Sequence, residues 1–576
     1  MAFETLKSIK PAFWLANGQE ACERLAYFGI RAVLPLMMVS VGTGGLGLDM
    51  ADKGIIYGIW ALIQCLVPMV SGGFSESFGY KKSLIVAFTI NTLGYLLMAN
   101  ILNIATLITG TGDLHPTLNF WLMLLGGCTI GLGTALFKPP VQGIVAKSLN
   151  EKNSGFGFGL FYWVVNVGGF LAPMIATALR GDTGNPTWHY VFYGAAFVTI
   201  FNLVITLIFF KEPKRTKEEL EKHKNESMAH VFVNTLKILW ADKNMLLFLL
   251  IVSGFWLMFM QLWDLLPNFI DEWVDGRSVG AALLSAADSL EIFTFRFSLF
   301  GNLYEFNPGD LLRSWTDNGA IKPEMIINID SAAIILFVLP LSALFARYKM
   351  MTALILGMII SVFGFVFSGM TTSAGFCCLG VFIFAIGEII CSPKFSEYIG
   401  MTAPKDKKAI YMGFSNIPFA VGWAFGNFLS GPLYQLFSSK EVLAREYLVN
   451  HGTNAAEIAN LKLNELMPLV QAKSGTADSF AATEVLWNEF APWNIWIVLG
   501  VIGVASMIGM ILFYYKSGMN KLDDARVAEN DDDDKSDDAD KSEEKSGDPK
   551  FEYTEAEKAL KKELTRDDVE NITIKD

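Results

Sequence analysis

The stretch AFWLANGQEACERLAYFGIRAVLPLMMVSV, residues 12–41, decides the fold of this chain. It is long enough to cross the hydrocarbon core of a bilayer, which takes roughly 20 predominantly apolar residues. Four ionisable residues nevertheless interrupt its interior, namely Glu20, Glu23, Arg24 and Arg31. A charged side chain inside a bilayer costs several kcal/mol unless it is paired or faces water. The stretch therefore predicts a membrane span whose charged side points into a helix bundle.

The spacing of these charges places them on a shared face. Glu20, Glu23 and Arg24 stand at i, i+3 and i+4, so they lie on one side of a helix and can pair there. Arg31 follows two turns later on nearly the same side. The internal charges and the lack of a small-residue cleavage site predict a retained span and not a signal peptide.

The composition extends this prediction to the whole chain. Of 576 residues, 52% are hydrophobic and only 18% are charged, and the mean hydropathy is positive, so a lipid-facing surface is expected. Further apolar runs lie near 54–74, 83–109, 119–147, 155–179, 190–210, 245–270, 329–346, 351–370, 375–398, 410–437 and 492–515. With residues 12–41 they make six runs before a polar linker and six after it, which is the organisation of major facilitator transporters.

This pattern predicts the domain organisation. We expect an N-terminal six-helix bundle over 1–210, a cytoplasmic linker over 211–243 and a C-terminal six-helix bundle over 244–516. The second bundle includes two long external loops, 271–328 and 438–490.

The acidic charge of the chain belongs to its last segment, 517–576, rather than to the membrane body. From Asp523 to the end there are 21 Asp or Glu against 10 Lys or Arg, and the whole chain carries −12. Such a segment lacks the apolar residues needed for a core, so we expect a mostly disordered cytoplasmic tail. Lys and Arg gather in alternate short connections, which predicts that both termini are cytoplasmic in a multi-pass protein of the cell membrane, inner or plasma.

Further ionisable residues lie inside the other apolar runs. Lys138 stands between Phe137 and Pro139 in the middle of its run, where an ammonium group needs a carboxylate, and Glu20 or Glu23 is a candidate partner. Asp264 and Glu388 are deep acids of the second half, while Asp330 and Glu397 lie nearer the ends of their runs. Each persistent charge marks a candidate functional site.

Four motifs resemble those of the proton-coupled oligopeptide transporters, a family of the major facilitator superfamily. The string Glu20–Arg31 resembles ExxER…YYGxR, with Phe28 in place of the second Tyr. Gly133–Pro139 resembles GxxxxKP, Phe161–Gly168 resembles FYxxINxG, and Phe255–Gln261 resembles FWxxFxQ. Gly387–Pro393 is similar to the tenth span of that family, though more loosely.

The resemblance implies an all-α membrane protein with the major facilitator fold, 12 transmembrane helices in two six-helix halves. It also implies a symporter that couples protons to the import of di- and tripeptides or similar zwitterionic solutes by alternating access. The implied proton-coupling residues are Glu20, Glu23, Arg24 and Lys138. The implied substrate-binding residues are Arg24, Tyr27, Lys138, Asn166, Trp256 and Gln261, with Glu388 receiving the amino group.

A loop motif resembles the gating motif of the major facilitator superfamily. It includes Gly72, Glu76, Gly79 and Lys81, with Glu76 where Asp is usual. The family usually has an acid before the Gln of the seventh span, and here that position is Met260. Asp264 lies one turn later on the same face, so we expect it to pair with Arg31 as a gate.

Two more departures leave the cargo open. Asp330 falls where the family generally has Asn, and Gln64 and Cys65 occupy the region before Pro68 where a Tyr is expected. One alternative is a major facilitator carrier for an amino acid, an organic acid or an exported compound. A non-transporting membrane receptor is a further alternative.

The sequence contains no motif that indicates an enzyme or a metal site. HExxH, GxSxG, Walker and dinucleotide-binding patterns are missing from the expected contexts. The five His are scattered, and the six Cys lack CxxC spacing. We therefore expect no enzyme, no metal and no cofactor other than a proton gradient. The expected partners are a small-molecule substrate, protons and the lipid bilayer, with no nucleic acid.

Overall fold

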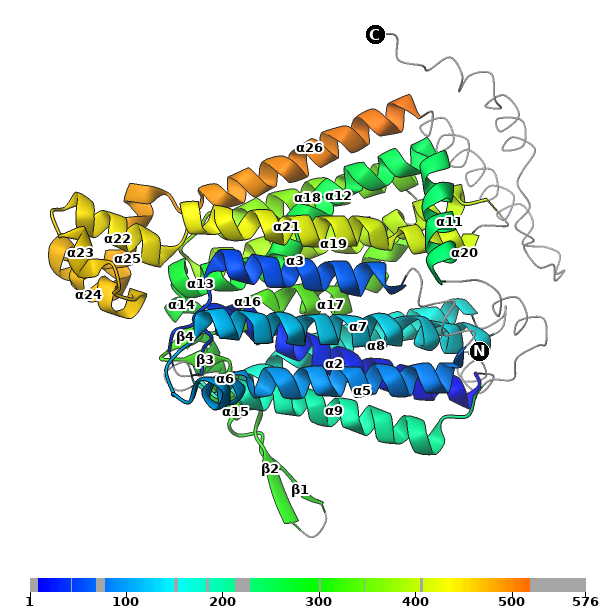
Figure 1. Ribbon diagram of the computed structural model, residues 1–576, viewed down its shortest axis with the longest axis horizontal. Helices are drawn as coiled ribbons and strands as arrows, with labels where there is room; N and C mark the ends of the chain where they lie inside the picture. The colour runs from blue at the N-terminus through cyan, green and yellow to red at the C-terminus, as the bar shows by residue number, and fades with distance from the viewer. Residues whose placement is uncertain are drawn as a thin grey trace.

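The protein is an elongated bundle of long helices that run side by side (Figure 1). The computed structural model describes residues 9–42, 44–68, 78–149, 154–182, 186–212, 228–299, 302–345, 348–404 and 408–517. Gly72 and Glu76 of the expected gating motif, most of the linker and the acidic tail from residue 518 onward lie outside these residues. We call the end where α2 begins and α26 ends the proximal end, and the opposite end the distal end.

Six long helices form the first half among the described residues. They are α2 (Pro11–Val39), α3 (Met50–Leu66), α5 (Tyr80–Ala99), α7 (Pro116–Ser148), α8 (Ser154–Arg180) and α9 (Trp188–Phe209). The shorter α6 (Ile101–Thr109) follows α5 at the distal end. Helix α5 packs on α7 and α9, and α2 packs on α8. The charged face of α2 is therefore turned toward neighbouring helices, as its buried Glu20, Glu23 and Arg24 require.

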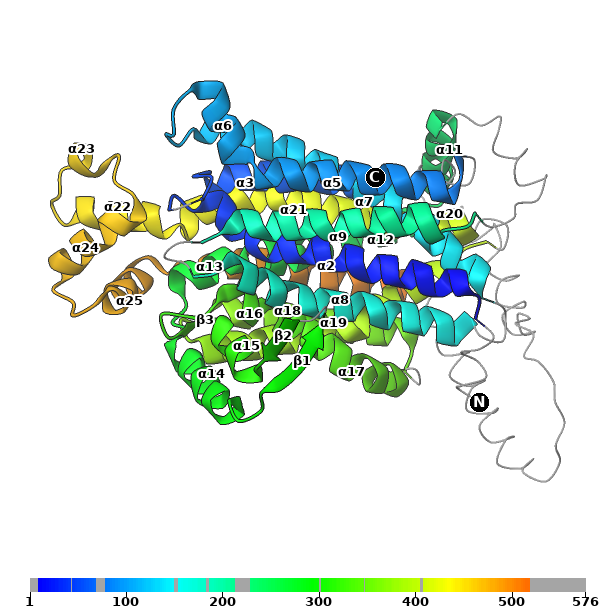
Figure 2. The ribbon, with the colours of Figure 1, turned by 90° about the horizontal axis from the view of Figure 1, so that it is seen from below.

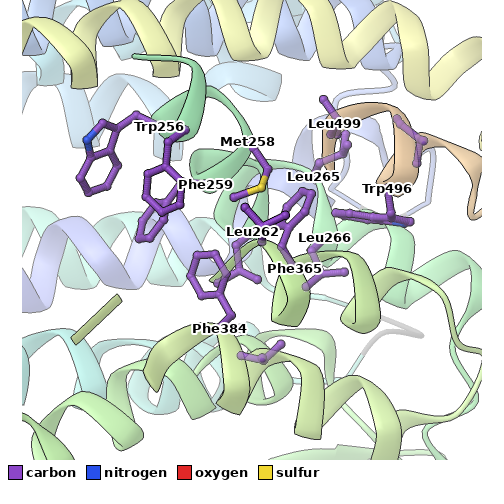
Figure 3. Close-up of a cluster of buried hydrophobic side chains, with 14 of the residues drawn as sticks. Trp256, Met258, Phe259, Leu262, Leu265, Leu266, Phe365, Phe384, Trp496 and Leu499 are labelled. Atoms are coloured by element: carbon purple, nitrogen blue, oxygen red, sulfur yellow. The ribbon is translucent and has the colours of Figure 1, made fainter. Parts of the chain in front are cut away.

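Six long helices also form the second half of the described chain. They are α12 (Lys243–Asp264), α17 (Ile329–Phe345), α18 (Met350–Gly369), α19 (Ala374–Thr402), α21 (Asn416–Phe437) and α26 (Asn494–Lys516). Two shorter helices, α11 (Met228–Ala241) and α20 (Lys408–Phe414), lie at the proximal end. Aromatic packing builds this half's core, where the ring of Phe259 lies 4.5 Å from that of Trp256 and 4.7 Å from that of Phe384 (Figure 3).

The distal end carries two structured insertions. The first comprises α13 (Leu266–Trp273), α14 (Arg277–Leu290), β1 (Phe295–Leu299), β2 (Asn302–Phe306), α15 (Pro308–Ser314), β3 (Thr316–Asp317), β4 (Ala320–Ile321) and α16 (Pro323–Ile327). Strands β1 and β2 pair antiparallel with Phe295 opposite Phe306, and β3 and β4 pair with Thr316 opposite Ile321. The second insertion comprises α22 (Lys440–Asn450), α23 (Ala455–Ile458), α24 (Leu463–Ser474) and α25 (Ser479–Phe490). It projects beyond the bundle (Figure 2).

The long helices match membrane spans in length and hydropathy. Within the described residues, eight helices qualify on both counts: α5, α7, α8, α9, α12, α18, α19 and α26. Helices α3 and α17 have only 17 residues each, and α2 is interrupted by its charges. Together with α21 they pack in the same bundle, which fits the twelve predicted spans. The chain is an integral, multi-pass membrane protein whose bundle is built of α-helices.

Glycines bring the two halves into close contact along α3 and α21. A Cβ atom at Gly54 would collide with the backbone carbonyl of Asn427, and one at Gly431 would collide with that of Met50. Only a residue without a side chain allows the backbones of α3 and α21 to come this close. The two helices can therefore cross here because these positions are glycine. Helix α8 meets α17 in a second contact between the halves.

Candidate functional site

The charges of α2 form a compact buried cluster. The Arg24 guanidinium pairs with Glu20 at 3.2 Å and also with Glu23. All three side chains are at least nine-tenths buried. The Thr134 hydroxyl of α7 donates a weak hydrogen bond of 3.4 Å to Glu23. One guanidinium thus forms ion pairs with two carboxylates.

Lys138 does not form the ion pair with Glu20 or Glu23 that the sequence analysis considered. Glu20 and Glu23 pair with Arg24, and Lys138 forms no ion pair among the described residues. The prediction that one of these acids neutralises Lys138 is therefore wrong for this conformation. Arg24 stands on the same helix as both acids, and its i+4 position relative to Glu20 places those two side chains on one face. The partly buried Lys138 ammonium is left as a cation able to bind another anion.

Tyr27 lies beside this cluster in a chain of hydrogen bonds. Its hydroxyl accepts from Gln64 Nε2 at 3.0 Å, and Gln64 Oε1 accepts from the Trp60 indole at 2.8 Å. The sequence analysis noted Gln64 only as a departure from the family pattern. Its hydrogen bonds hold the Tyr27 side chain in place, and the Arg24 guanidinium lies 5.3 Å from the centre of the Tyr27 ring.

Arg31 and Asp264 form an ion pair between the two halves. Asp264 is fully buried, and its other oxygen accepts from the Trp423 indole at 2.5 Å and from Asn427 at 2.7 Å. The Arg31 guanidinium also lies 4.4 Å from the Tyr57 ring. Asp264 thus makes the contact with Arg31 that the sequence analysis expected in place of an acid at Met260.

Lys53 adds a second contact at the same place. It is 1% exposed and donates to the Asp264 carbonyl at 2.7 Å and to Asn268 Oδ1 at 2.6 Å. Asn268 in turn donates to the Pro35 carbonyl at 2.9 Å. The sequence analysis missed Lys53 because the apolar run was taken to begin at residue 54. The position of this lysine immediately before an apolar run could have marked it as a candidate for a buried contact.

A third contact between the halves lies at the distal ends of α8 and α16. Arg180 pairs with Glu324 at 2.9 Å, with side chains 1% and 0% exposed. Lys322 donates to the Gly181 carbonyl, and Asn328 donates to the Phe170 carbonyl, both at 3.0 Å. The sequence analysis placed residues 271–328 in a loop and so did not find this ion pair.

The second half supplies two acids to the space opposite α8. Asp330 stands in the first turn of α17 and is 1% exposed, and Glu388 lies on α19, which packs against α17. Tyr162 lies on α8, which also packs against α17, and it is 44% exposed. Asn166, one turn further along α8, donates to the Tyr162 carbonyl at 2.8 Å. The two acids therefore lie on adjacent helices of the second half, one of which meets α8 across the boundary between the halves.

Two of the predicted binding residues are packed in the protein interior. Trp256 is 3% exposed, and its ring lies 4.0 Å from that of Phe419. Gln261 is fully buried and donates to the Leu257 carbonyl of its own helix at 3.2 Å. Close packing of α12 against Gly422 and Gly426 of α21 explains this burial. In this conformation both residues support α12 and offer no exposed surface to a ligand.

The described part of the gating motif is anchored within the first half. Gly79 immediately precedes α5 and has a φ of 112°. Residues other than Gly rarely adopt this backbone conformation. The Lys81 ammonium donates to the Leu207 carbonyl at 3.0 Å. The Glu212 carboxylate accepts from the backbone amides of Tyr80 and Lys81, both at 2.8 Å, where the positive end of the α5 dipole favours an anion.

Residues 21–427 match the family model described as the Major Facilitator Superfamily. The chain therefore belongs to this family of transporters, which is not a class of enzymes. Several of the similar proteins are peptide transporters, as the motifs predicted. The peptide transporter YePEPT of Yersinia enterocolitica is 30% identical over 195 residues, which cover 33% of this chain and 34% of that protein.

Two further relatives are also carriers or transporters by name. Solute carrier family 15 member 2 of Oryctolagus cuniculus is 29% identical over 30% of this chain and 22% of its own. The di-/tripeptide transporter of Lactococcus lactis is 27% identical over 32% of this chain and 34% of its own. The matched segments span about a third or less of these relatives, so the substrate of the whole chain does not follow from them.

Solved structures confirm the fold over most of the chain. A POT family transporter in complex with 5-aminolevulinic acid matches 89% of this chain and 99% of its own, with a TM-score of 0.56 and 16% identity. A mutant of the nucleoside transporter NupG matches 87% of this chain and 100% of its own, with a TM-score of 0.55 and 13% identity. Since both fit equally well, the fold alone does not select a substrate.

Proposed function

We propose that this protein is a proton-coupled symporter that imports di- and tripeptides or similar zwitterionic solutes across the cell membrane by alternating access. The observation that carries the proposal is the distribution of buried charge between the halves. The first half presents Lys138, a cation without an ion pair among the described residues, beside the cluster of α2. The second half presents Asp330 and Glu388. A zwitterion has the complementary charges at its two ends.

The proposal places the distal end outside the cell and both termini in the cytoplasm, as the alternating Lys and Arg clusters favour. The contacts Arg31–Asp264, Lys53–Asn268 and Arg180–Glu324 then hold the external side closed. Opening to the outside requires all of them to break. In this scheme the structure corresponds to a state closed toward the exterior.

Proton coupling operates through Arg24. Glu20 and Glu23 both pair with it, so their charges hold the guanidinium on its own helix. Protonation of one carboxyl removes one partner and frees donors of Arg24. Arg24 and Lys138 then bind the substrate carboxylate together, which is a charge-assisted interaction. Proton binding and substrate binding thereby favour the same state, as symport requires.

The test is uptake of labelled dialanine into proteoliposomes with an inward proton gradient. Lys138→Gln and Glu23→Gln are expected to abolish gradient-driven uptake. The matched controls Lys473→Gln and Glu484→Gln, at exposed positions of α24 and α25, are expected to retain it. Proton-driven uptake that survives Lys138→Gln and Glu23→Gln contradicts the scheme. Competition by dipeptides, single amino acids and organic acids distinguishes a peptide carrier from a major facilitator carrier of another solute.

A further inference from the structure

The hairpin of β1 and β2 leaves the bundle sideways. Figure 1 and Figure 2 together show it projecting across the direction of the long helices, whereas the helices α22–α25 continue beyond the bundle along that direction. The long helices cross the bilayer, so an element that projects sideways near their distal ends runs along the membrane surface and not away from it. The hairpin therefore lies where lipid and water meet.

Three large apolar side chains are exposed at the base of this hairpin. Ile292 and Phe293 follow the end of α14, Phe295 begins β1, and their exposed fractions are 80%, 53% and 57%. Exposed apolar side chains that gather in one place mark a surface that contacts an apolar partner. Phe197 of α9, on a helix that matches a membrane span, is exposed in the same way. The base of the hairpin thus has the apolar character of the lipid-facing surface of the bundle.

The opposite face of the hairpin is polar. Successive residues of a strand point to opposite faces, so Phe295 and its neighbour Arg296 lie on different sides of β1. Arg296 stands opposite Glu305 of β2 and pairs with it at 2.6 Å, and both side chains are more than half exposed. An element with one apolar and one charged face is suited to lie in the plane of a membrane interface.

Hydrogen bonds and ion pairs fix the base of the hairpin to α14 and α15. Asn307 donates to the Glu291 carbonyl at 3.0 Å and to the Thr294 hydroxyl at 3.1 Å, which joins the two ends of the hairpin. Arg313 of α15 pairs with Asp288 of α14 at 2.9 Å and with Glu291 at 3.2 Å. The sideways direction of the hairpin is therefore set by these two helices.

We propose that Ile292, Phe293 and Phe295 insert into the bilayer interface at the distal end, so that the hairpin anchors the second half to the surrounding phospholipids. An open sheet edge is not tolerated in the hydrocarbon core, because its backbone groups have no partners there. The insertion therefore stops near the boundary of headgroups and acyl chains, about 5–10 Å deep. The Arg296–Glu305 pair stays on the water side.

Apolar contact, and not attraction to anionic lipids, drives this insertion. The charge of Arg296 is balanced by Glu305, and Arg313 is outnumbered by Asp288 and Glu291. A hairpin with this charge distribution gains nothing from a negative membrane surface. Zwitterionic phosphatidylcholine alone is therefore expected to hold it as well as a mixture with phosphatidylglycerol does.

The test is photochemical cross-linking of the full-length protein in phosphatidylcholine liposomes. The photoreactive residue p-benzoylphenylalanine replaces Phe295 in one variant and Glu305, on the opposite face, in the matched control. Irradiation is expected to give a phospholipid adduct at position 295, detected by mass spectrometry, and several-fold less adduct at position 305. The same probe in place of Phe197 is the positive control for contact with lipid. A variant with the probe in place of Phe293 repeats the test where β1 is not altered.

The outcomes separate the bilayer from other partners of this surface. A cross-linked dimer at positions 293 and 295, without a lipid adduct, assigns the surface to a second copy of the chain and overturns the proposal. Equal lipid labelling at positions 295 and 305 overturns it as well, and so does an adduct that forms only when phosphatidylglycerol is present. The inference does not depend on the cargo, because a covalent adduct and not uptake is measured.

Discussion

Arg31 of α2 and Asp264 of α12 form an ion pair across the two halves of the molecule, although 233 residues separate them in the sequence. Asp264 is fully buried, and Arg31 is 9% exposed. Removing one partner of such a pair leaves an uncompensated buried charge, which typically costs about 3–5 kcal/mol. The pair is thus stable only while the halves stay together at this end. This property makes it a suitable gate.

We expect Asp264→Asn to open the distal end. The substitution keeps the shape of the side chain but removes the charge that holds Arg31. Distances between spin labels at Thr111 and Glu457, which are exposed on opposite halves of the distal end, are expected to become longer and more broadly distributed. The control is Asp310→Asn, whose ion pair with Arg313 is exposed. An unchanged distance distribution in Asp264→Asn would show that this pair does not keep the gate closed.

The Arg180–Glu324 pair allows a test by paired substitutions. Arg180→Met and Glu324→Leu are each expected to lower thermal stability in detergent, because each leaves the other charge buried. The double variant replaces both charges with apolar groups and is expected to be more stable than either single variant, with a coupling of roughly 1–3 kcal/mol. Additive losses in the double variant would indicate that the two side chains act independently.

The sequence predicts the helical architecture well because a membrane leaves few choices. Each span must be a long apolar helix, so the runs locate the spans, and charges that interrupt a run must face the interior. The Arg31–Asp264 contact could also be predicted, since Asp264 lies one turn from the position where an acid was expected. The locations of the spans depend on the period and length of single helices. The Arg31–Asp264 contact, which joins two helices, was predicted from the resemblance to the family, and the helical period only placed Asp264 on the expected face.

The missed contacts all depend on packing between helices. The pairing of Lys138 was predicted wrongly because its helix and α2 had to be placed relative to each other, whereas the competing Arg24 pair is local. Arg180 and Glu324 lie at the edges of their segments, where a charge normally meets water. Only the folded insertion between α12 and α17 buries them together. The same holds for Gln64, whose role appears once Tyr27 and Trp60 are beside it.

The attachment of the helices α22–α25 to the bundle is expected to depend on pH. Glu272 of α13 accepts from the Tyr434 hydroxyl at 2.9 Å and from the Lys440 amide at 3.0 Å. Burial raises the pKa of Glu272 to about 7, although both hydrogen bonds oppose this shift. Because the folded-state pKa lies above the unfolded one, the stabilisation is complete below about pH 4.5 and is lost as the pH rises through about 7.

Hydrogen exchange of the α22 amides measures this dependence. In wild type, their protection is expected to fall as the pH rises through about 7, after correction for the intrinsic exchange rate. Glu272→Gln mimics the protonated side chain, so its protection is expected to stay constant over that range. A variant with the same pH profile as wild type would assign the effect to another group, such as Lys440.

The crossing of α3 and α21 can be tested with single methyl groups. Gly→Ala inside an exposed helix normally stabilises it by about 1 kcal/mol, because Ala has the higher helix propensity. At Gly18 of α2 nothing lies within 4 Å of the added Cβ, so Gly18→Ala is expected to be neutral or stabilising. At Gly54 the added methyl meets the Asn427 carbonyl, which belongs to the other half and cannot rotate away. Gly54→Ala is therefore expected to lower thermal stability and to force the halves apart at the distal end, with the same increase in spin-label distance as Asp264→Asn. Equal behaviour of the two glycine variants would mean that α3 and α21 do not approach as closely as the backbone indicates.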